Sequence, residues 1–250
     1  MRTTQELVAQ FTDVSILPPE GSKVVQIISG GMDSVTLLHF LTKHLKCEVT
    51  TLSFNYGQKH VRELQMAKAN AAACGVNHQI IDLPFISELF KSDLLSSGGA
   101  IPEGHYEAEN MKQTVVPNRN MIMASIAVGY GQSLGFQYLS LGVHAGDHAI
   151  YPDCRAEFIE AFKGAVELSD WNPFSIRAPF QRMTKVEILE MGLSLSPAVD
   201  YSTTWTCYKG EESACGVCGS CQERLAAFAA CGMEDPLPYT DRETWKQHVK

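Results

Sequence analysis

One stretch of six residues constrains the fold of this chain more than any other. It has the sequence SGGMDS and consists of Ser29, Gly30, Gly31, Met32, Asp33 and Ser34. A β-branched run at residues 24–28 precedes it and predicts a buried strand. The leucines that follow, at positions 37, 38, 41 and 45, have the spacing of one helix face. A short glycine-rich loop therefore joins a strand to a helix N-terminus.

Such a loop is suited to binding phosphate groups. Gly30 and Gly31 permit a close backbone approach, and the N–H groups of a helix start attract anions. Ser29 and Ser34 add hydroxyl groups, and Asp33 adds a carboxylate suited to Mg²⁺. The loop has neither the Gly-Lys-Ser/Thr ending of a Walker A motif nor the G-x-G-x-x-G pattern, so those two nucleotide folds are disfavoured. The alternative is an ordinary strand-to-helix turn.

Composition limits the class of protein. The chain has 250 residues, of which 45% are hydrophobic and 19% charged, enough for one globular domain with a small appendage. A net charge of −8 argues against direct nucleic-acid binding. No apolar run has the length of a membrane span, and the first residues lack a signal-peptide core. We therefore expect a cytoplasmic protein with reduced thiols and no membrane partner.

Strand and helix patterns alternate through the chain, which predicts an α/β protein with a doubly wound, mostly parallel sheet. Thr184 and Glu187 have capping-box spacing and predict a helix that stops at Gly192. Ligands of such sheets bind at the carboxyl ends of the strands, where SGGMDS and residues 55–58 both fall. The expected strands lie at 24–28, 48–54, 78–83 and 138–143, and the expected helices follow residue 34 and begin near 62, 121, 158 and 185.

The predicted organisation has four parts: an N-terminal extension at 1–22, a main domain at 23–206, a cysteine knuckle at 207–231 and a tail with a short helix at 232–250. The extension contains a short amphipathic helix with Leu7, Val8 and Phe11 on its apolar face. Residues 92–113 lack periodicity, which favours either a mobile loop or a functional lid.

Four of the eight cysteines are clustered. Cys207, Cys215, Cys218 and Cys221 follow the pattern C-x7-C-x2-C-x2-C. Four thiolates at this spacing suit a structural Zn²⁺ site with no position open to water. An iron–sulfur cluster also takes four thiolates, but its usual spacings differ. A redox C-x2-C would leave two cysteines unexplained.

Taken together, these motifs resemble those of the 7-cyano-7-deazaguanine synthase family, within the ATP-pyrophosphatase superfamily. The resemblance covers residues 24 to about 230 and includes the stretches FNYGQ at 54–58, VPNRN at 116–120, YPDCR at 151–155 and TCY at 206–208. It departs from the family pattern at Asn118, where the family often has glycine, and in the length of the N-terminal extension.

The resemblance implies a fold like that of the adenine nucleotide α-hydrolases and an ATP-dependent carbon–nitrogen ligase. Its substrates would be 7-carboxy-7-deazaguanine, ammonia and ATP, its product the nitrile precursor of queuosine, and its intermediates an acyl adenylate and an amide. The implied ions are Mg²⁺ and Zn²⁺, and the implied assembly is a homodimer.

Residue roles follow from these stretches and, for Lys185, from its place at the start of the capping-box helix. Arg119 is a bidentate donor for a carboxylate or phosphate, or else a surface arginine at a helix start. Lys185 offers a charge for the α-phosphate, or else extends into solvent at a helix N-terminus. Asp153 is expected to bind the base or a metal, or else to cap a helix. Tyr56, Gln58 and Tyr151 are expected to bind the substrate. In contrast, His144 and His148 are interpreted as loop histidines, and Cys154 is not expected to be a nucleophile.

Three other functions fit part of the pattern. A tRNA-thiolating pyrophosphatase shares the loop, although it should carry a basic RNA-binding surface and a reactive cysteine pair. A ligase that joins the activated carboxylate to another amine would keep every motif. A nucleotide-binding module with a structural zinc would leave ATP intact.

Overall fold

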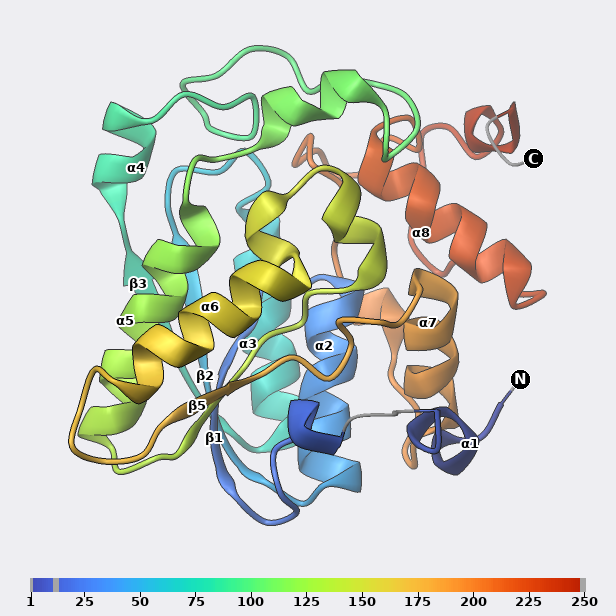
Figure 1. Ribbon diagram of the computed structural model, residues 1–250. Helices are drawn as coiled ribbons and strands as arrows, with labels where there is room; N and C mark the ends of the chain where they lie inside the picture. The colour runs from blue at the N-terminus through green and yellow to red at the C-terminus, as the bar shows by residue number, and fades with distance from the viewer. Residues whose placement is uncertain (1, 11–13, 248–250) are drawn as a thin grey trace.

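The computed structural model describes residues 2–10 and 14–247, and a parallel five-stranded sheet crosses its centre (Figure 1). The strand order is β3-β2-β1-β4-β5, and all neighbouring pairs are parallel. The strands are β1 (Lys23–Ile27), β2 (Glu48–Asn55), β3 (Asn77–Asp82), β4 (Tyr138–Ser140) and β5 (Ser175–Arg177). The predicted fold class is confirmed.

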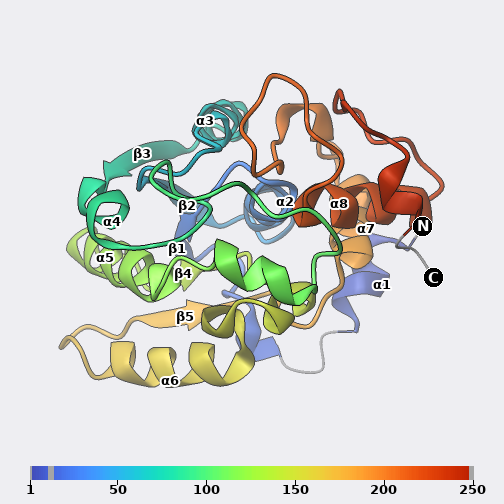
Figure 2. The same cartoon turned by 90° about the horizontal axis from the view of Figure 1, so that it is seen from above.

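Helices cover both faces of the sheet. Figure 2 shows α2 and α3 on one face and α5 and α6 on the other, the arrangement of a doubly wound sheet. The helices are α1 (Thr4–Val8), α2 (Met32–His39), α3 (Arg62–Cys74), α4 (Pro84–Leu89), α5 (Arg119–Ser133), α6 (Ala156–Glu167), α7 (Lys185–Ser194) and α8 (Gly219–Ala230). None of the described helices is both long and apolar enough to cross a membrane.

The sheet has a topological switch point between β1 and β4, where the order in which successive strands are added reverses. From β1 the sheet extends to β2 and β3 on one side and to β4 and β5 on the other. Loops that leave two such strands run to opposite faces, and a crevice opens between them at the carboxyl ends. The SGGMDS loop leaves β1 at this crevice, so the topology places it where a ligand can enter.

The core forms two layers because both faces of the sheet are covered. Val24 and Val25 are neighbours in β1 and face opposite sides, yet neither is exposed to solvent. This explains why β1 has a continuous apolar run instead of an alternating one. One layer packs β1 against α5 and α6, and the other packs α2 against α7 and α8.

Most element boundaries agree with the sequence patterns within three residues. The capping box at Thr184 is present, with its hydroxyl bound to the N–H of Glu187. However, the helix does not stop at Gly192, and α7 continues to Ser194. A Cβ on Gly192 would lie 2.0 Å from the Tyr201 hydroxyl, so this glycine permits close packing and does not end the helix.

The N-terminal extension packs on α7. Leu7 of α1 is buried, and Arg2 forms ion pairs with Glu187 and Glu190 of α7. The predicted apolar partner Phe11 lies outside the described residues. At the other end, the predicted short helix of the tail is a 3₁₀ turn, Thr244–Gln247.

A fully buried ion pair holds the C-terminal part of the chain together. Arg224 of α8 donates to both carboxylate oxygens of Asp235 at 2.7 and 3.0 Å, and its remaining nitrogen, Nη1, donates to the hydroxyls of Thr204 and Thr206. Removing one partner leaves an uncompensated buried charge. We expect Asp235→Ala to lower the free energy of unfolding by about 3–5 kcal/mol, measured by urea denaturation.

The neighbouring Glu234 provides the control, because its side chain is 82% exposed in its ion pair with Arg242. Glu234→Ala should change the unfolding free energy by less than about 1 kcal/mol. Equal effects of the two substitutions would show that the buried pair contributes no more to the free energy of unfolding than the exposed pair.

Candidate active site

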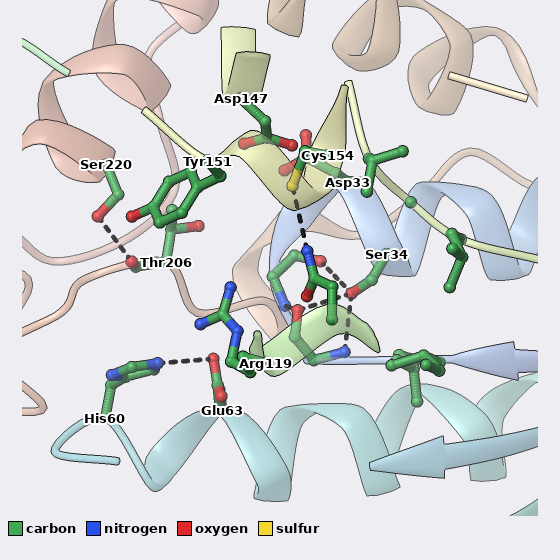
Figure 3. Close-up of a pocket in the computed structure, with 18 of the residues that line it drawn as sticks. Asp33, Ser34, His60, Glu63, Arg119, Asp147, Tyr151, Cys154, Thr206 and Ser220 are labelled. Atoms are coloured by element: carbon green, nitrogen blue, oxygen red, sulfur yellow. Dashed lines mark hydrogen bonds and ion pairs between the residues drawn. The ribbon is translucent and has the colours of Figure 1, made fainter. Parts of the chain in front are cut away.

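A pocket opens in the crevice at the carboxyl ends of β1, β2 and β4, and residues from five helices line it (Figure 3). Of the predicted site residues, the structure brings eight to its wall: Ser29, Gly31, Asp33, Ser34, Tyr56, Arg119, Tyr151 and Lys185. The other four, Gly30, Met32, Gln58 and Asp153, are not among the residues that line it. Residues far apart in the chain thus meet in one cavity.

The SGGMDS loop is held in shape by its own hydroxyl groups and by α3. The Ser34 hydroxyl accepts the N–H groups of Ser29 and Gly30, each at 3.2 Å. Gly30 has φ +91°, and a Cβ there would lie 2.1 Å from the carbonyl oxygen of Glu63, so only glycine fits. Met32 is fully buried and anchors the loop in the core. Gly31 caps α2 without a side-chain hydrogen bond, which leaves the first N–H groups for an anion.

Beside the loop, Lys185 bridges two carboxylates. Its Nζ lies 2.6 Å from Oδ2 of Asp33 and 3.3 Å from Oε2 of Glu223. Burial alone would raise the pKa of Asp33, but the charge of Lys185 lowers it below its usual value. Likewise, burial would lower the pKa of Lys185, but Asp33 and Glu223 raise it. The opposite charges of these side chains therefore keep both Asp33 and Lys185 ionised at neutral pH.

The second oxygen of Asp33 is a candidate metal ligand. Oδ1 is buried and has no hydrogen-bond partner among the described residues. An ionised carboxylate oxygen beside a phosphate-binding loop is the kind of ligand that Mg²⁺ takes from a protein. This single oxygen is therefore suited to binding Mg²⁺ together with the phosphates of a nucleotide.

Arg119 begins α5 and faces the pocket as a cation without a carboxylate partner. Its guanidinium lies 5.8 and 5.9 Å from the ring centres of Tyr56 and Tyr151, and it donates to the Tyr56 hydroxyl at 3.3 Å. In residues 2–10 and 14–247, no carboxylate oxygen lies within 4.0 Å of it. Asn118 enters the helix with φ +57°, a left-handed conformation that asparagine tolerates. The arrangement presents a planar donor to an anion.

Two predicted substrate residues form hydrogen bonds with residues of the pocket wall without lining the pocket themselves. Gln58 accepts the N–H of Tyr56 at 2.8 Å and donates to the carbonyl of Phe54 at 3.0 Å, which shapes the turn after β2. The carboxylate of Asp153 accepts the N–H of Asn120 at 3.1 Å, at the N-terminus of α5. Asp153 thus caps a helix, although this helix is α5 and not α6, which follows it in the chain.

Of the two histidines and the cysteine weighed in the sequence, His144 and Cys154 lie close to the pocket. His144 is buried, accepts the Gly146 N–H on Nδ1 and lies 3.4 Å from Asp147. Burial raises the pKa of the Cys154 thiol well above its usual value, which disfavours a nucleophilic thiolate. Their surroundings therefore provide neither a metal site nor a nucleophile.

The aperiodic segment at 92–113 lies along one side of the pocket. Tyr106 lines the cavity and donates its hydroxyl to Asp147 at 2.9 Å. Glu103 forms an ion pair with Lys209 at 2.8 Å, and the Gly104 N–H binds the Val217 carbonyl. Contacts with the cysteine region therefore hold this segment beside the pocket.

The four clustered cysteines have the arrangement of a metal site. Their sulfur atoms lie within 4.8 Å of one another, all four are buried, and Sγ of Cys215 lies 3.9 Å from Sγ of Cys221. A tetrahedral ion with metal–sulfur bonds of about 2.3 Å needs sulfur atoms about 3.8 Å apart. The geometry fits a four-coordinate ion. The knuckle also borders the pocket, because Ser220 donates to the carbonyl of Thr206 and both residues line it (Figure 3).

Sequence reasoning missed three acidic residues of the pocket: Glu63, Asp147 and Glu223. Each lies close to a recognised motif: Glu63 five residues after FNYGQ, Asp147 four residues before YPDCR, and Glu223 two residues after Cys221. Proximity to these motifs was the available signal. These three side chains meet in one pocket because of the way α3, α8 and the loop after β4 pack together.

The doubly wound sheet, the phosphate loop at its switch point and the adjoining four-cysteine site define an ATP-pyrophosphatase-type enzyme. Comparison with known proteins narrows this class. Residues 23–232 match the family model described as "Queuosine biosynthesis protein QueC", and the chain belongs to that family.

Curated relatives support the assignment. A protein of Hahella chejuensis is 50% identical over 228 residues, covering 91% of this chain and 96% of its own length. A protein of Marinobacter nauticus is 53% identical over 216 residues, covering 86% of this chain and 96% of its own. Both are named 7-cyano-7-deazaguanine synthase.

A solved structure shares the fold at low sequence identity. The U34-tRNA thiolase NcsA from Methanococcus maripaludis, solved with its [4Fe-4S] cluster, superposes with a TM-score of 0.50 at 13% identity. The match covers 76% of this chain and 61% of that one. At this identity the likeness shows a common fold alone.

Proposed function

We propose that this chain converts 7-carboxy-7-deazaguanine and ammonia to 7-cyano-7-deazaguanine at the expense of ATP. One observation supports this most directly: a phosphate-binding loop and an arginine without a carboxylate partner face the same pocket. The loop suits the phosphates of ATP, and Arg119 suits the carboxylate of a second substrate. The relatives' shared name supplies the product, 7-cyano-7-deazaguanine, and the family resemblance implies the carboxylate substrate.

The first half of the reaction activates the carboxylate. Arg119 holds the carboxylate so that one oxygen can attack the α-phosphorus, and the P–O bond to pyrophosphate breaks. The N–H groups at the start of α2 stabilise the leaving pyrophosphate, and Lys185 offsets negative charge at the α-phosphate. Mg²⁺, held by Asp33, would neutralise phosphate charge. The products are an acyl adenylate and pyrophosphate.

Ammonia completes the conversion in two stages. Its attack on the acyl carbon expels AMP and a proton, which leaves the amide. A second ATP then adenylates the amide oxygen, and loss of AMP and a proton leaves the nitrile. The overall change consumes two ATP and releases two AMP and two pyrophosphate.

We also propose that the four cysteines hold a structural Zn²⁺. All four positions of the ion would be filled by thiolates, so it has no open position for a substrate. Its place beside Thr206 and Ser220 suggests that it stabilises the pocket wall. The cytoplasmic location and the homodimer stay predictions from the composition and the family resemblance.

The fate of ATP tests the reaction sequence. With ATP below saturation, we expect AMP as the nucleotide product and accumulation of the 7-deazaguanine amide. The amide supplied with ATP, in place of the carboxylate and ammonia, should give nitrile with one further AMP. Chromatography of the nucleotides and mass spectrometry of the base measure both.

Three outcomes would contradict this scheme. ADP as the nucleotide product would place the attack on another phosphorus. AMP together with a base joined to a different amine would favour the conjugating ligase, while unchanged ATP would favour a binding module.

A further inference from the structure

Glu63 occupies an unusual place for a glutamate. It lies in the first turn of α3 and lines the pocket with a side chain that is only 12% exposed. Gln58 donates to its Oε1 at 3.3 Å, and Nε2 of His60 lies 3.4 Å from its Oε2. Figure 3 shows Arg119 directly above Glu63, with His60 beside it. A carboxyl group thus adjoins the cation that is expected to bind the substrate carboxylate.

The neighbours of Glu63 keep their charge states around neutral pH. Burial lowers the pKa of His60 to about 3, so the imidazole is uncharged. Burial raises the pKa of Tyr56 to about 12, so the phenol is uncharged as well. Arg119 stays a cation. These three groups are the titratable or charged side chains that face Glu63 from its own helix entry, from the end of β2 and from α5.

Glu63 itself changes its protonation state within the pH range between 6.5 and 9.5. Burial raises its pKa to about 8, although the charge of Arg119 and the hydrogen bond from Gln58 act in the opposite direction. Below pH 8 the group is a neutral acid and a hydrogen-bond donor. Above pH 8 it becomes an anion next to Arg119.

We infer that Glu63 is a specificity-determining residue whose carboxyl group donates a hydrogen bond to the ring carbonyl of the substrate base. This rests on the proposed function. In 7-carboxy-7-deazaguanine, the carboxylate on the five-membered ring lies next to the carbonyl of the six-membered ring. A carboxylate bound to Arg119 therefore brings that carbonyl towards the neighbouring side chain.

The ionised form of Glu63 opposes binding for two reasons. It would repel the substrate carboxylate and leave the ring carbonyl without a donor, and it would compensate the charge of Arg119. Only the protonated form is then competent, and the apparent dissociation constant varies inversely with its fraction. Affinity for the carboxylate should accordingly fall as pH rises through 8.

Titration calorimetry of 7-carboxy-7-deazaguanine without ATP tests this between pH 6.5 and 9.5. For the unaltered protein, we expect the dissociation constant to rise about tenfold per pH unit above pH 8. The corresponding amide has no charge to repel and should show a much smaller rise. This comparison of two ligands needs no variant.

Glu63→Gln should remove the alkaline rise for the carboxylate, because glutamine stays neutral and can still donate. At pH 7 its dissociation constant should stay within about threefold of the unaltered protein. Glu157→Gln is the matched control, in the exposed first turn of α6, and should keep the rise.

The outcomes separate the two proposals. A flat profile for the unaltered protein, or an alkaline rise that persists in Glu63→Gln, overturns the role of Glu63. Binding of the carboxylate with the expected pH profile but without turnover contradicts the proposed reaction and leaves Glu63 as a binding residue. Failure of the carboxylate to bind at any pH overturns both.

Discussion

Arg119→Lys is expected to lower kcat/KM for 7-carboxy-7-deazaguanine by about 100-fold. Lysine keeps the positive charge, but it loses the planar fork that gives two parallel hydrogen bonds to a carboxylate. Loss of about 3 kcal/mol of binding to the reacting group corresponds to that factor. Steady-state kinetics with the carboxylate varied at saturating ATP and ammonia measures it.

A second arginine provides the control for this substitution. Arg2 binds Glu187 and Glu190 and does not line the pocket. Arg2→Lys should change kcat/KM by less than about threefold. Unchanged kinetics for Arg119→Lys would place the substrate carboxylate elsewhere in the pocket.

Cys215→Ser is expected to release the metal ion and destabilise the whole chain. A structural ion contributes its binding energy to folding, and one missing thiolate removes much of it. A loss of about 5 kcal/mol would lower the melting temperature by about 10–20 °C in a chain of this size. Elemental analysis should find one zinc per chain before the substitution, and calorimetry should record the lower melting temperature after it.

Cys74→Ser is the control, because Cys74 is a partly buried thiol outside the knuckle. It should keep the zinc and shift the melting temperature by only a few degrees. Stoichiometric iron in the purified protein would refute the zinc assignment. A metal-free Cys215→Ser variant that melts normally would refute the folding role.

Local sequence patterns predicted much of the fold because their physical causes are local. The β-branched run before SGGMDS, the periodic helix at 62–74 and the capping box at Thr184 each depend on neighbouring residues. The short strand β5 was not predicted, because three residues are too few to show the alternation that identifies a strand in a sequence. Gly192 was misinterpreted as a helix stop because its close contact with Tyr201 is a tertiary feature.

The sequence by itself determined the chemical groups of the site. Its motifs identified the phosphate loop, Arg119 and the four-cysteine knuckle, because each belongs to a short stretch whose residue types and spacing serve a definite chemistry. Lys185 was identified by its charge at the start of a predicted helix.

Only the tertiary structure decided which of these groups meet and in which protonation state. Gln58 and Asp153 belong to the same motifs as Tyr56 and Tyr151, yet they do not line the pocket, because neighbouring side chains in a turn point in different directions. Glu63 has an ordinary sequence context, and it becomes a neutral acid because folding removes its carboxyl from water beside Arg119. Burial and the distance between remote residues exist only in the folded chain, and they set the pKa values on which this site depends.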